Sequence, residues 1–253
     1  MDIVSWNVNG IRAAAKKGLA EYMQERDADI YCLQEIKAYP GQLPPNIRSI
    51  DPWKSYFHPA QRKGYSGTAI YTKREPKSVK IGLGSHKFDS EGRMLTLDFG
   101  DFLLYNSYFP NGTARKERLD YKLEFYDFFL EQLIRQRQSG REIIICGDFN
   151  TAHRPIDLAR PEENKNTSGF LPQERAWLDE LITSGFIDTY RQFDDSPGKY
   201  TWWDMKTRAR DRNVGWRIDY FFASSGLTDN LVGAAIEADQ PGSDHCPISL
   251  KLK

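Results

Sequence analysis

The stretch Glu142-Ile143-Ile144-Ile145-Cys146-Gly147-Asp148-Phe149-Asn150 begins as an apolar strand and ends in polar side chains. Its β-branched run is typical of a buried strand. Side chains two residues apart share a face of a strand, and here that face carries Ile144, Cys146, Asp148 and Asn150. The sequence therefore predicts a central strand whose end presents a carboxylate and an amide together.

The same change from apolar to polar occurs at the ends of three further predicted strands. A single polar strand end is most often an element that meets solvent, but four of them in one chain indicate a shared site. The polar positions of the other three strands are Glu35, the pair Asn106 and Tyr108, and the set Ser5, Asn7 and Asn9.

The remaining pattern consists of short apolar runs and a few long helical segments, with no internal repeat. Eight strands are expected, over residues 2–8, 29–35, 67–72, 94–98, 102–108, 142–147, 216–223 and 248–252. Helices are expected over 11–26, 115–139 and 172–184. Because strands outnumber helices and do not alternate regularly with them, we expect one α/β (α+β) domain, residues 1–253, with two packed sheets and outer helices.

The composition of the chain limits the kinds of molecule that it can bind and the compartment in which we expect it. The 253 residues include 35 basic and 35 acidic side chains, so a polyanion must be held by a local patch and not by net charge. No apolar run is long enough to cross a bilayer, and the first residues lack the pattern of a signal peptide. Three separated cysteines fit buried thiols, so we expect a soluble protein of the cytoplasm.

Two segments near the carboxyl end add an imidazole, namely Trp216-Arg217-Ile218-Asp219-Tyr220 and Ser243-Asp244-His245. A carboxylate on one ring nitrogen of a histidine fixes the ring and stabilises its charged form. Adjacent side chains point to opposite faces of an extended segment, so we assign this role to Asp219 and leave Asp244 for a metal ion or water. An ordinary turn before the last strand remains an equal alternative for Asp244-His245.

Carboxylates and amides without thiolates favour a hard cation such as magnesium or manganese. Such an ion keeps most of its waters and takes one or two protein carboxylates together with phosphate oxygens. No Walker loop, dinucleotide-binding glycine pattern or Gly-x-Ser-x-Gly motif is present. The donor set therefore indicates metal-assisted phosphoryl chemistry.

Seven segments, in order and spacing from residue 3 to 252, resemble the exonuclease III family of abasic-site endonucleases, within the deoxyribonuclease I-like superfamily. The resemblance implies a four-layer α-β-β-α sandwich, two mixed central sheets flanked by helices, with the site at one open edge. The segments are Trp6-Asn7-Val8-Asn9-Gly10, Leu33-Gln34-Glu35, Tyr108-Phe109-Pro110-Asn111, Gly147-Asp148-Phe149-Asn150, Gly169-Phe170-Leu171-Pro172-Gln173-Glu174-Arg175, Trp216-Arg217-Ile218-Asp219-Tyr220 and Ser243-Asp244-His245.

The resemblance also implies roles for the polar residues. Asp148 is expected as the general base and Asn150 as the amide that positions the attacking water. Tyr108 is expected near the scissile phosphate, and His245, oriented by Asp219, as a donor to a phosphate oxygen. The expected metal-binding set is Glu35, Asn7, Asp148, Asn150, Asp244 and His245. Asn9 stands where some relatives carry Asp, which puts a second protein-bound metal in doubt.

DNA contacts are implied in the same way. Trp202, Trp216 and Ile218 match positions that line an apolar pocket for a sugar without a base, although the two tryptophans also suit an ordinary core. Arg208, Arg210 and Arg212 alternate with Lys206 before the Trp216 segment and are candidate phosphate contacts, as is Tyr65 after Arg62 and Lys63. A solvated charged surface also explains these cations. Asn111 and Asn164 match positions that contact DNA or the target phosphate.

The expected activity is magnesium-dependent hydrolysis on the 5′ side of abasic sites in double-stranded DNA, leaving a 3′-hydroxyl and a 5′-deoxyribose phosphate, with 3′–5′ exonuclease activity. We expect a monomer associated with the nucleoid of a prokaryotic-type cell and partners among base excision repair proteins. One alternative is a phosphoesterase of the same fold acting on inositol lipids or sphingomyelin. The other is a catalytically silent DNA-damage binding module, which should have lost Glu35, Asp148, Asn150, Asp219 or His245.

Overall fold

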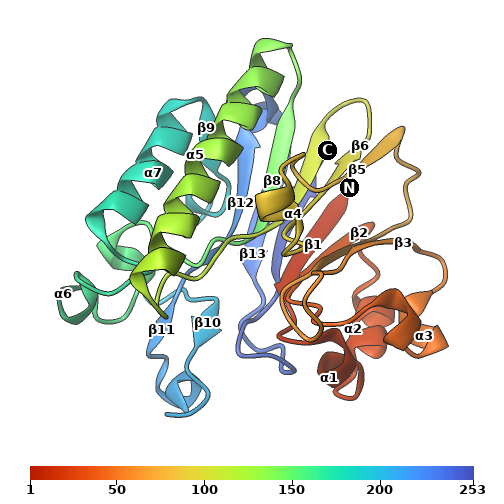
Figure 1. Cartoon of the computed structure of the whole chain (residues 1–253), viewed down its shortest axis with the longest axis horizontal. Helices are drawn as coiled ribbons and strands as arrows, with labels where there is room; N and C mark the ends of the chain where they lie inside the picture. The colour runs from red at the N-terminus through yellow and green to blue at the C-terminus, as the bar shows by residue number, and fades with distance from the viewer.

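The computed structural model describes residues 1–253 and contains two six-stranded sheets and a separate two-stranded hairpin (Figure 1). The first sheet runs β13 (Leu231–Ile236), β14 (Ile248–Leu252), β1 (Asp2–Asn7), β2 (Ile30–Gln34), β4 (Thr68–Thr72), β3 (Lys54–His58). The second runs β5 (Ser78–Ile81), β6 (Met94–Asp98), β7 (Leu103–Tyr108), β8 (Ile143–Asp148), β12 (Asp219–Ser224), β9 (Phe186–Asp188). Each sheet is mixed, because β1 and β2 are parallel, β7 and β8 are parallel, and the other neighbours are antiparallel.

Helices cover the outer face of both sheets, as Figure 1 shows from left to right. The long α5 (Lys116–Gln138) and α7 (Pro172–Thr183) lie on the second sheet. The short α1 (Ile11–Ala15), α2 (Leu19–Arg26) and α3 (Pro45–Arg48) lie on the first. Two single-turn helices, α4 (His86–Asp89) and α6 (Pro161–Asn164), lie in loops. None of these helices combines the length and the apolar character needed to span a membrane.

The alternation of side chains along β8 explains the layers. Ile143 and Ile145 belong to the apolar cluster under α5 and α7, whereas Ile144 and Cys146 belong to the cluster between the two sheets. A strand that is buried on both faces reads as a continuous apolar run, which is what the sequence shows here. The predicted four-layer sandwich is therefore confirmed.

Two predicted elements are broken in the structure. The single helix expected over residues 11–26 is wrong, because Gly18, with φ of 92°, takes a left-handed conformation that separates α1 from α2. The strand expected over 216–223 is also divided. Trp216 belongs to β11 (Gly215–Trp216), which pairs with β10 (Trp202–Trp203) in a hairpin outside both sheets, and β12 begins only at Asp219.

The strands that the sequence did not indicate clearly are mostly at sheet edges. Strands β3, β5, β9 and β13 each end a sheet, and β10 belongs to the small hairpin. Most residues of these edge strands are partly or fully exposed, so the strands lack the strong apolar run or strict alternation that identifies a central strand. The eight expected strands include the central β1, β2, β7, β8 and β12, which position the site.

Candidate active site

Most of the side chains predicted at strand ends meet at one end of the two sheets, opposite both chain termini (Figure 1). Ser5 and Asn106 do not line this site and are instead buried, each hydrogen-bonded to Gln34. Tyr108 at the end of β7 is the register partner of Asp148 at the end of β8, and Asp219 at the start of β12 is its partner on the other side. Ligand atoms of Glu35, Asp148 and His245 lie within 4.8 Å of one another. Residues far apart in the sequence thus converge at one point.

The backbone near the end of β8 leaves no room for a side chain at Gly147. A Cβ atom on Gly147 would come within 1.8 Å of the carbonyl oxygen of Ser107 on the adjacent β7. Only glycine fits there, and its φ of 136° also favours a residue without a side chain. Gly147 therefore allows the ends of β7 and β8 to bring Tyr108 beside Asp148.

A cavity of about 370 Å³ opens over these residues. Ten of the predicted site residues line it, while Asn7 and Asp219 are buried beneath its floor. The lining is polar on one side and aromatic on the other. The lining residues are Asn9, Glu35, Tyr108, Asn111, Thr113, Asp148, Asn150, Thr167, Ser168, Gly169, Trp202, Trp216, Ile218, Asp244 and His245.

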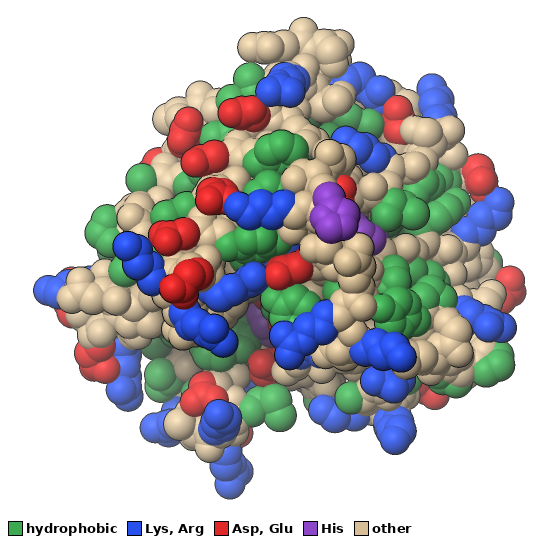
Figure 2. All heavy atoms as spheres, viewed as in Figure 1, with side chains coloured by type: hydrophobic (Ala, Val, Ile, Leu, Met, Phe, Trp, Pro, Cys, Tyr) green, Lys and Arg blue, Asp and Glu red, His purple; other side chains and the backbone are tan.

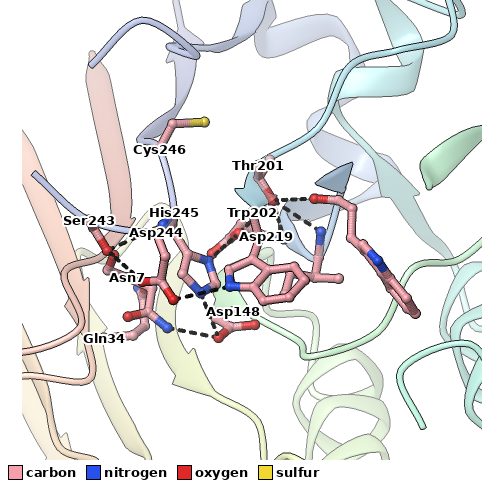
Figure 3. A network of polar contacts seen from close by, with 12 residues as sticks. Asn7, Gln34, Asp148, Thr201, Trp202, Asp219, Ser243, Asp244, His245 and Cys246 are labelled. Carbon is pink, nitrogen blue, oxygen red and sulfur yellow. Dashed lines mark hydrogen bonds and ion pairs between the residues drawn. The ribbon is translucent and has the colours of Figure 1, made fainter. Parts of the chain in front are cut away.

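His245 is held between two carboxylates, as Figure 3 shows. Its Nδ1 lies 2.9 Å from Oδ2 of Asp219, and its Nε2 lies 3.8 Å from Oδ2 of Asp148. Thr201 donates to the same Asp219 oxygen at 2.6 Å and fixes that carboxylate. Burial opposes the charged ring, but Asp219 and Asp148 outweigh it and raise the pKa of His245 to about 10. At neutral pH the ring is an imidazolium, a hydrogen-bond donor.

Asp148 is 1% exposed and is surrounded by donors. The side-chain amide of Asn7 donates to its Oδ2 at 2.8 Å, and the backbone N–H of Asn150 donates to its Oδ1 at 2.8 Å. Burial raises the pKa of Asp148 to about 7, opposed by His245 and reinforced by the charges of Asp219 and Glu35. A carboxylate with a pKa near neutrality is suited to accept and release a proton.

Glu35 follows β2 with a left-handed backbone, φ 51°, and its side chain is 16% exposed at the cavity. Asn7 donates to its Oε1 at 2.9 Å, and the ammonium of Lys37 lies 2.6 Å from its Oε2. Burial would raise the pKa of Glu35, but the charge of Lys37 and the hydrogen bonds from Asn7 and Lys37 outweigh it and lower that pKa. Glu35 is therefore a fixed anion.

Tyr108 rests on a buried arginine that the sequence did not single out. The guanidinium of Arg93 lies 4.7 Å from the centre of the Tyr108 ring and donates to the Tyr108 carbonyl at 2.9 Å. Burial and the Glu35 carboxylate raise the pKa of Tyr108, and Arg93 opposes them. Tyr65 does not line the cavity. Its hydroxyl instead accepts hydrogen bonds from Arg93, the arginine that contacts the Tyr108 ring, and from Arg118.

The aromatic side of the cavity is the β10–β11 hairpin, in which Trp202 and Trp216 are directly opposed. With Ile218 they form a wall next to the charged cluster. The indole N–H of Trp202 donates to Oδ2 of Asp244 at 3.1 Å (Figure 3). Asn9 donates to the other oxygen of Asp244 at 2.9 Å. Both oxygens of Asp244 therefore have protein partners, which link the two sides of the cavity.

The other predicted contact residues are dispersed. Asn111 donates to Oδ1 of Asn150 at 2.9 Å, whereas Asn164 is half-buried on α6, outside the cavity lining. The three arginines lie in or next to a tight turn, Ala209–Arg212, and not along an extended strand. Arg208 pairs with Asp211, Arg212 donates to the Thr207 carbonyl, and Arg210 donates to the carbonyls of Ala238, Gln240 and Ser243. Figure 2 shows Lys and Arg side chains along the lower rim of the molecule.

The donor set of the cavity fits a hard divalent cation. Two carboxylates, Glu35 and Asp148, face the same space with the Asn7 amide between them, and no cysteine lines the cavity. Oxygen ligands of this kind suit magnesium or manganese better than zinc. The acidic cluster can therefore hold a metal ion.

Comparisons with known proteins agree with this geometry. A model of the endonuclease/exonuclease/phosphatase family matches residues 4–245. An exodeoxyribonuclease of Bacillus subtilis (strain 168) is 42% identical over 252 residues, which cover 99% of this chain and 98% of the relative. The DNA repair nuclease APEX1 of Danio rerio is 40% identical over 255 residues, which cover 100% of this chain and 82% of the relative.

Solved structures show the same likeness. An AP endonuclease from Archaeoglobus fulgidus has a TM-score of 0.91 at 27% identity, covering 100% of this chain and 99% of that one. The catalytic domain of APE2 from Xenopus laevis has a TM-score of 0.88 at 32% identity, covering 100% and 92%. By fold, site geometry and sequence, this chain belongs to the endonuclease/exonuclease/phosphatase family and, within it, to the exonuclease III family of abasic-site endonucleases.

Proposed function

We propose that the chain is a DNA repair nuclease that hydrolyses the phosphodiester on the 5′ side of an abasic site in double-stranded DNA. The observation that carries this proposal is the single cavity in which Asp148, Glu35 and His245 adjoin the wall of Trp202, Trp216 and Ile218. A phosphodiester suits the charged side, and a deoxyribose without a base suits the apolar side. Relatives named as exodeoxyribonuclease and as DNA repair nuclease support the same assignment. We also propose an exonuclease activity, in the 3′–5′ direction.

Asp148 is the general base of this proposal. It takes a proton from a water molecule whose oxygen attacks the phosphorus, and the bond from phosphorus to the 3′ oxygen breaks. Asn150 positions that water. Its side-chain N–H group donates a hydrogen bond to the Phe109 carbonyl at 3.0 Å, which fixes the amide. The products are a 3′-hydroxyl, which gains a proton, and a 5′-deoxyribose phosphate.

Charge that gathers on the phosphate oxygens meets groups already in place. The His245 imidazolium donates from Nε2, while Asp219 keeps the ring charged and oriented through Nδ1. The Tyr108 phenol lines the same cavity and, in this proposal, would lie near the departing oxygen.

The metal ion of this proposal is magnesium, with manganese as a substitute. Glu35 and Asn7 would hold it, with Asp148, Asn150, Asp244 and His245 around the same space. When bound, the ion supplies positive charge to a phosphate oxygen. The Asn7 amide, which now donates to both Glu35 and Asp148, would keep the two carboxylates apart and in register.

The wider setting is proposed on the same basis. The substrate is duplex DNA held by local contacts, since the chain has 35 basic and 35 acidic side chains. Asn111, Asn164, Tyr65, Arg208, Arg210 and Arg212 remain candidate contacts. We propose one domain over residues 1–253 acting as a monomer, cytoplasmic and associated with the nucleoid, with base excision repair proteins as partners.

The decisive experiment uses a duplex with a single tetrahydrofuran residue as the abasic analogue. The purified protein is incubated with it, with and without magnesium, and the cut is mapped on a sequencing gel. We expect one magnesium-dependent cut immediately 5′ of the analogue, ending in a 3′-hydroxyl. Release of phosphate or headgroups from inositol lipids or sphingomyelin, without cleavage of this duplex, would overturn the proposal.

A further inference from the structure

The segment Gly169-Phe170-Leu171-Pro172-Gln173-Glu174-Arg175 contains a charge that no step above uses. Glu174, in the first turn of α7, pairs with Lys122 of α5, with Nζ and Oε1 2.7 Å apart. Both side chains are 0% exposed. Removing two charges from water is unfavourable, and a buried ion pair by itself is weak evidence for a stabilising role. The other contacts of the two side chains therefore decide what the pair does.

Lys122 reaches the backbone beneath the cavity. Its ammonium donates to the carbonyl oxygen of Asn150 at 2.8 Å and to Oγ1 of Thr151 at 2.7 Å. Asn150 has φ of 51°, a left-handed conformation that asparagine adopts more readily than other residues with a side chain. The hydrogen bond from Lys122 to its carbonyl adds a restraint on that conformation. Lys122 thus fixes the peptide unit directly after the amide that faces Asp148.

Glu174 holds the segment of residues 168–171, on another side of the cavity from Asn150. Its Oε1 accepts a hydrogen bond from the Ser168 hydroxyl at 2.9 Å, and its Oε2 accepts hydrogen bonds from the backbone N–H groups of Gly169 at 2.6 Å and Leu171 at 3.0 Å. Ser168 and Gly169 line the cavity.

Gly169 fills the narrow space between the polar and the aromatic sides. A Cβ atom there would lie 3.2 Å from the Asn150 carbonyl oxygen and 3.3 Å from the Trp216 ring. Its carbonyl accepts a hydrogen bond from the N–H of Ala152 at 2.8 Å. A small shift of this segment would therefore move Asn150 relative to Trp216.

Docking of the two helices does not require the ion pair. Tyr126 of α5 stacks on Trp177 of α7 with ring centres 4.2 Å apart, within a core cluster of 20 buried residues. Apolar side chains at positions 122 and 174 would pack the helices as well. The charged pair instead satisfies backbone and hydroxyl groups of the cavity floor and wall.

We propose that Lys122 and Glu174 form a positioning pair that holds Asn150 and the 168–171 segment in one geometry. The pair thereby keeps the Asn150 amide, which positions the water, at a fixed distance from the apolar wall of the cavity. This inference rests on the proposed function. Neither residue touches the substrate. Loss of the pair is expected to slow the chemical step while DNA binding changes little, because misplacement by about 1 Å can reduce a rate about 100-fold.

The first test is the neutral double variant Lys122→Met/Glu174→Gln. Glutamine keeps an acceptor for the N–H groups of Gly169 and Leu171, and methionine keeps the volume of the lysine stem, so the loop bonds remain and the cation on Asn150 is lost. We expect a Tm close to that of the wild type, single-turnover cleavage of the tetrahydrofuran duplex about 10- to 100-fold slower, and a Kd for that duplex within about 3-fold. Wild-type cleavage by the folded double variant would overturn the proposal.

A second pair of variants decides the matter even when the double variant does not fold. Thr151 is fully buried and accepts from Lys122, so Thr151→Val removes that acceptor and Thr151→Ser retains it. We expect Thr151→Val to cleave several-fold more slowly and Thr151→Ser to match the wild type. Equal rates for the two would overturn the proposal.

Two comparisons separate this inference from other outcomes. Arg141 pairs with Asp98 at 2.6 Å at the other end of β8, so Arg141→Met removes an ion pair without touching the cavity. It should lower Tm and leave the cleavage rate unchanged; a rate loss equal to that of Thr151→Val would show that both effects are general destabilisation. Failure of the wild-type protein to cleave the duplex would instead refute the proposed function itself.

Discussion

Glu35 and Asp148 end strands of different sheets and share one amide, yet their surroundings differ. Glu35 is partly open to the cavity and lies 2.6 Å from the Lys37 ammonium, which helps lower its pKa. Asp148 is 1% exposed and lies near two other carboxylates, and its pKa is raised to about 7. Two carboxylates whose surroundings move their pKa values apart are suited to different tasks.

This contrast supports the roles that we propose for the two carboxylates. A carboxylate that stays ionised can hold a cation, and a carboxylate that titrates near neutrality can take a proton from water. Asn7 donates to both at 2.9 and 2.8 Å, so a single amide group helps to orient both carboxylates. In the proposed mechanism, the junction of the two sheets would therefore provide both the carboxylate that holds the metal ion, Glu35, and the carboxylate that accepts the proton, Asp148.

The largest expected effect comes from a change to Asp148, the buried carboxylate. Asp148→Asn keeps the shape of the side chain and removes the proton acceptor, so single-turnover cleavage should fall by about 100- to 10,000-fold. The Kd for the tetrahydrofuran duplex, measured by gel shift, should stay within about 3-fold. Near-normal turnover would refute the role of Asp148 as the base.

Asp219→Asn tests the surroundings of Asp148 and His245 through the pH dependence of the cleavage rate. In the wild type the pKa of His245 is raised to about 10, so the ring stays charged until the pH rises through that value. Loss of the Asp219 charge lowers this pKa, and the imidazolium is then lost at lower pH. We expect the alkaline limb of kcat/KM, measured from pH 6 to 10, to move downward, with a rate loss of about 100-fold at its upper end. An unchanged limb would mean that Asp219 does not maintain the charge of the ring.

Glu35→Gln tests the carboxylate that is partly open to the cavity. Loss of this fixed anion should raise the magnesium concentration for half-maximal cleavage at least about 10-fold, with a smaller effect at saturating magnesium. Glu163→Gln is the matched control, because Glu163 is an exposed carboxylate on α6 outside the cavity. Identical magnesium titrations for the two variants would exclude Glu35 as a ligand.

The smallest effect is expected where neither carboxylate is touched. Trp216→Ala opens the apolar wall and should reduce the preference for the tetrahydrofuran duplex over an intact duplex about 10-fold. Competition binding with the two duplexes measures this ratio. Equal losses of affinity for both would show that the indole supports the fold and not recognition.

The sequence was most informative where periodicity and strand ends coincide. Parallel pairing could predict that Asn7 ends beside Glu35 in one sheet and that Tyr108 ends beside Asp148 in the other. The packing of the two sheets, which brings Glu35 to Asp148, was implied only by the family resemblance. Gly18 inside an amphipathic stretch was a visible signal for the break between α1 and α2 that the prediction did not use. The short edge strands gave no such signal.

Partners buried behind the site could not be found in this way. Arg93 and Lys122 are separated in sequence from the groups they hold, whereas Lys37 lies two residues from Glu35. Each has the appearance of an ordinary surface cation until the fold buries it or points it inward. The arginines near Trp216 show the reverse case. Their alternation indicated a common basic face, but a tight turn places Arg210 against three main-chain carbonyls.

The division of labour between Glu35 and Asp148 has one direct test. Single-turnover cleavage of the tetrahydrofuran duplex is measured for wild type, Glu35→Gln and Asp148→Asn across a magnesium titration that extends to saturation. Excess magnesium should restore most of the rate of Glu35→Gln and none of the rate of Asp148→Asn. Recovery of Asp148→Asn by magnesium, with Glu35→Gln unresponsive, would contradict the assignment.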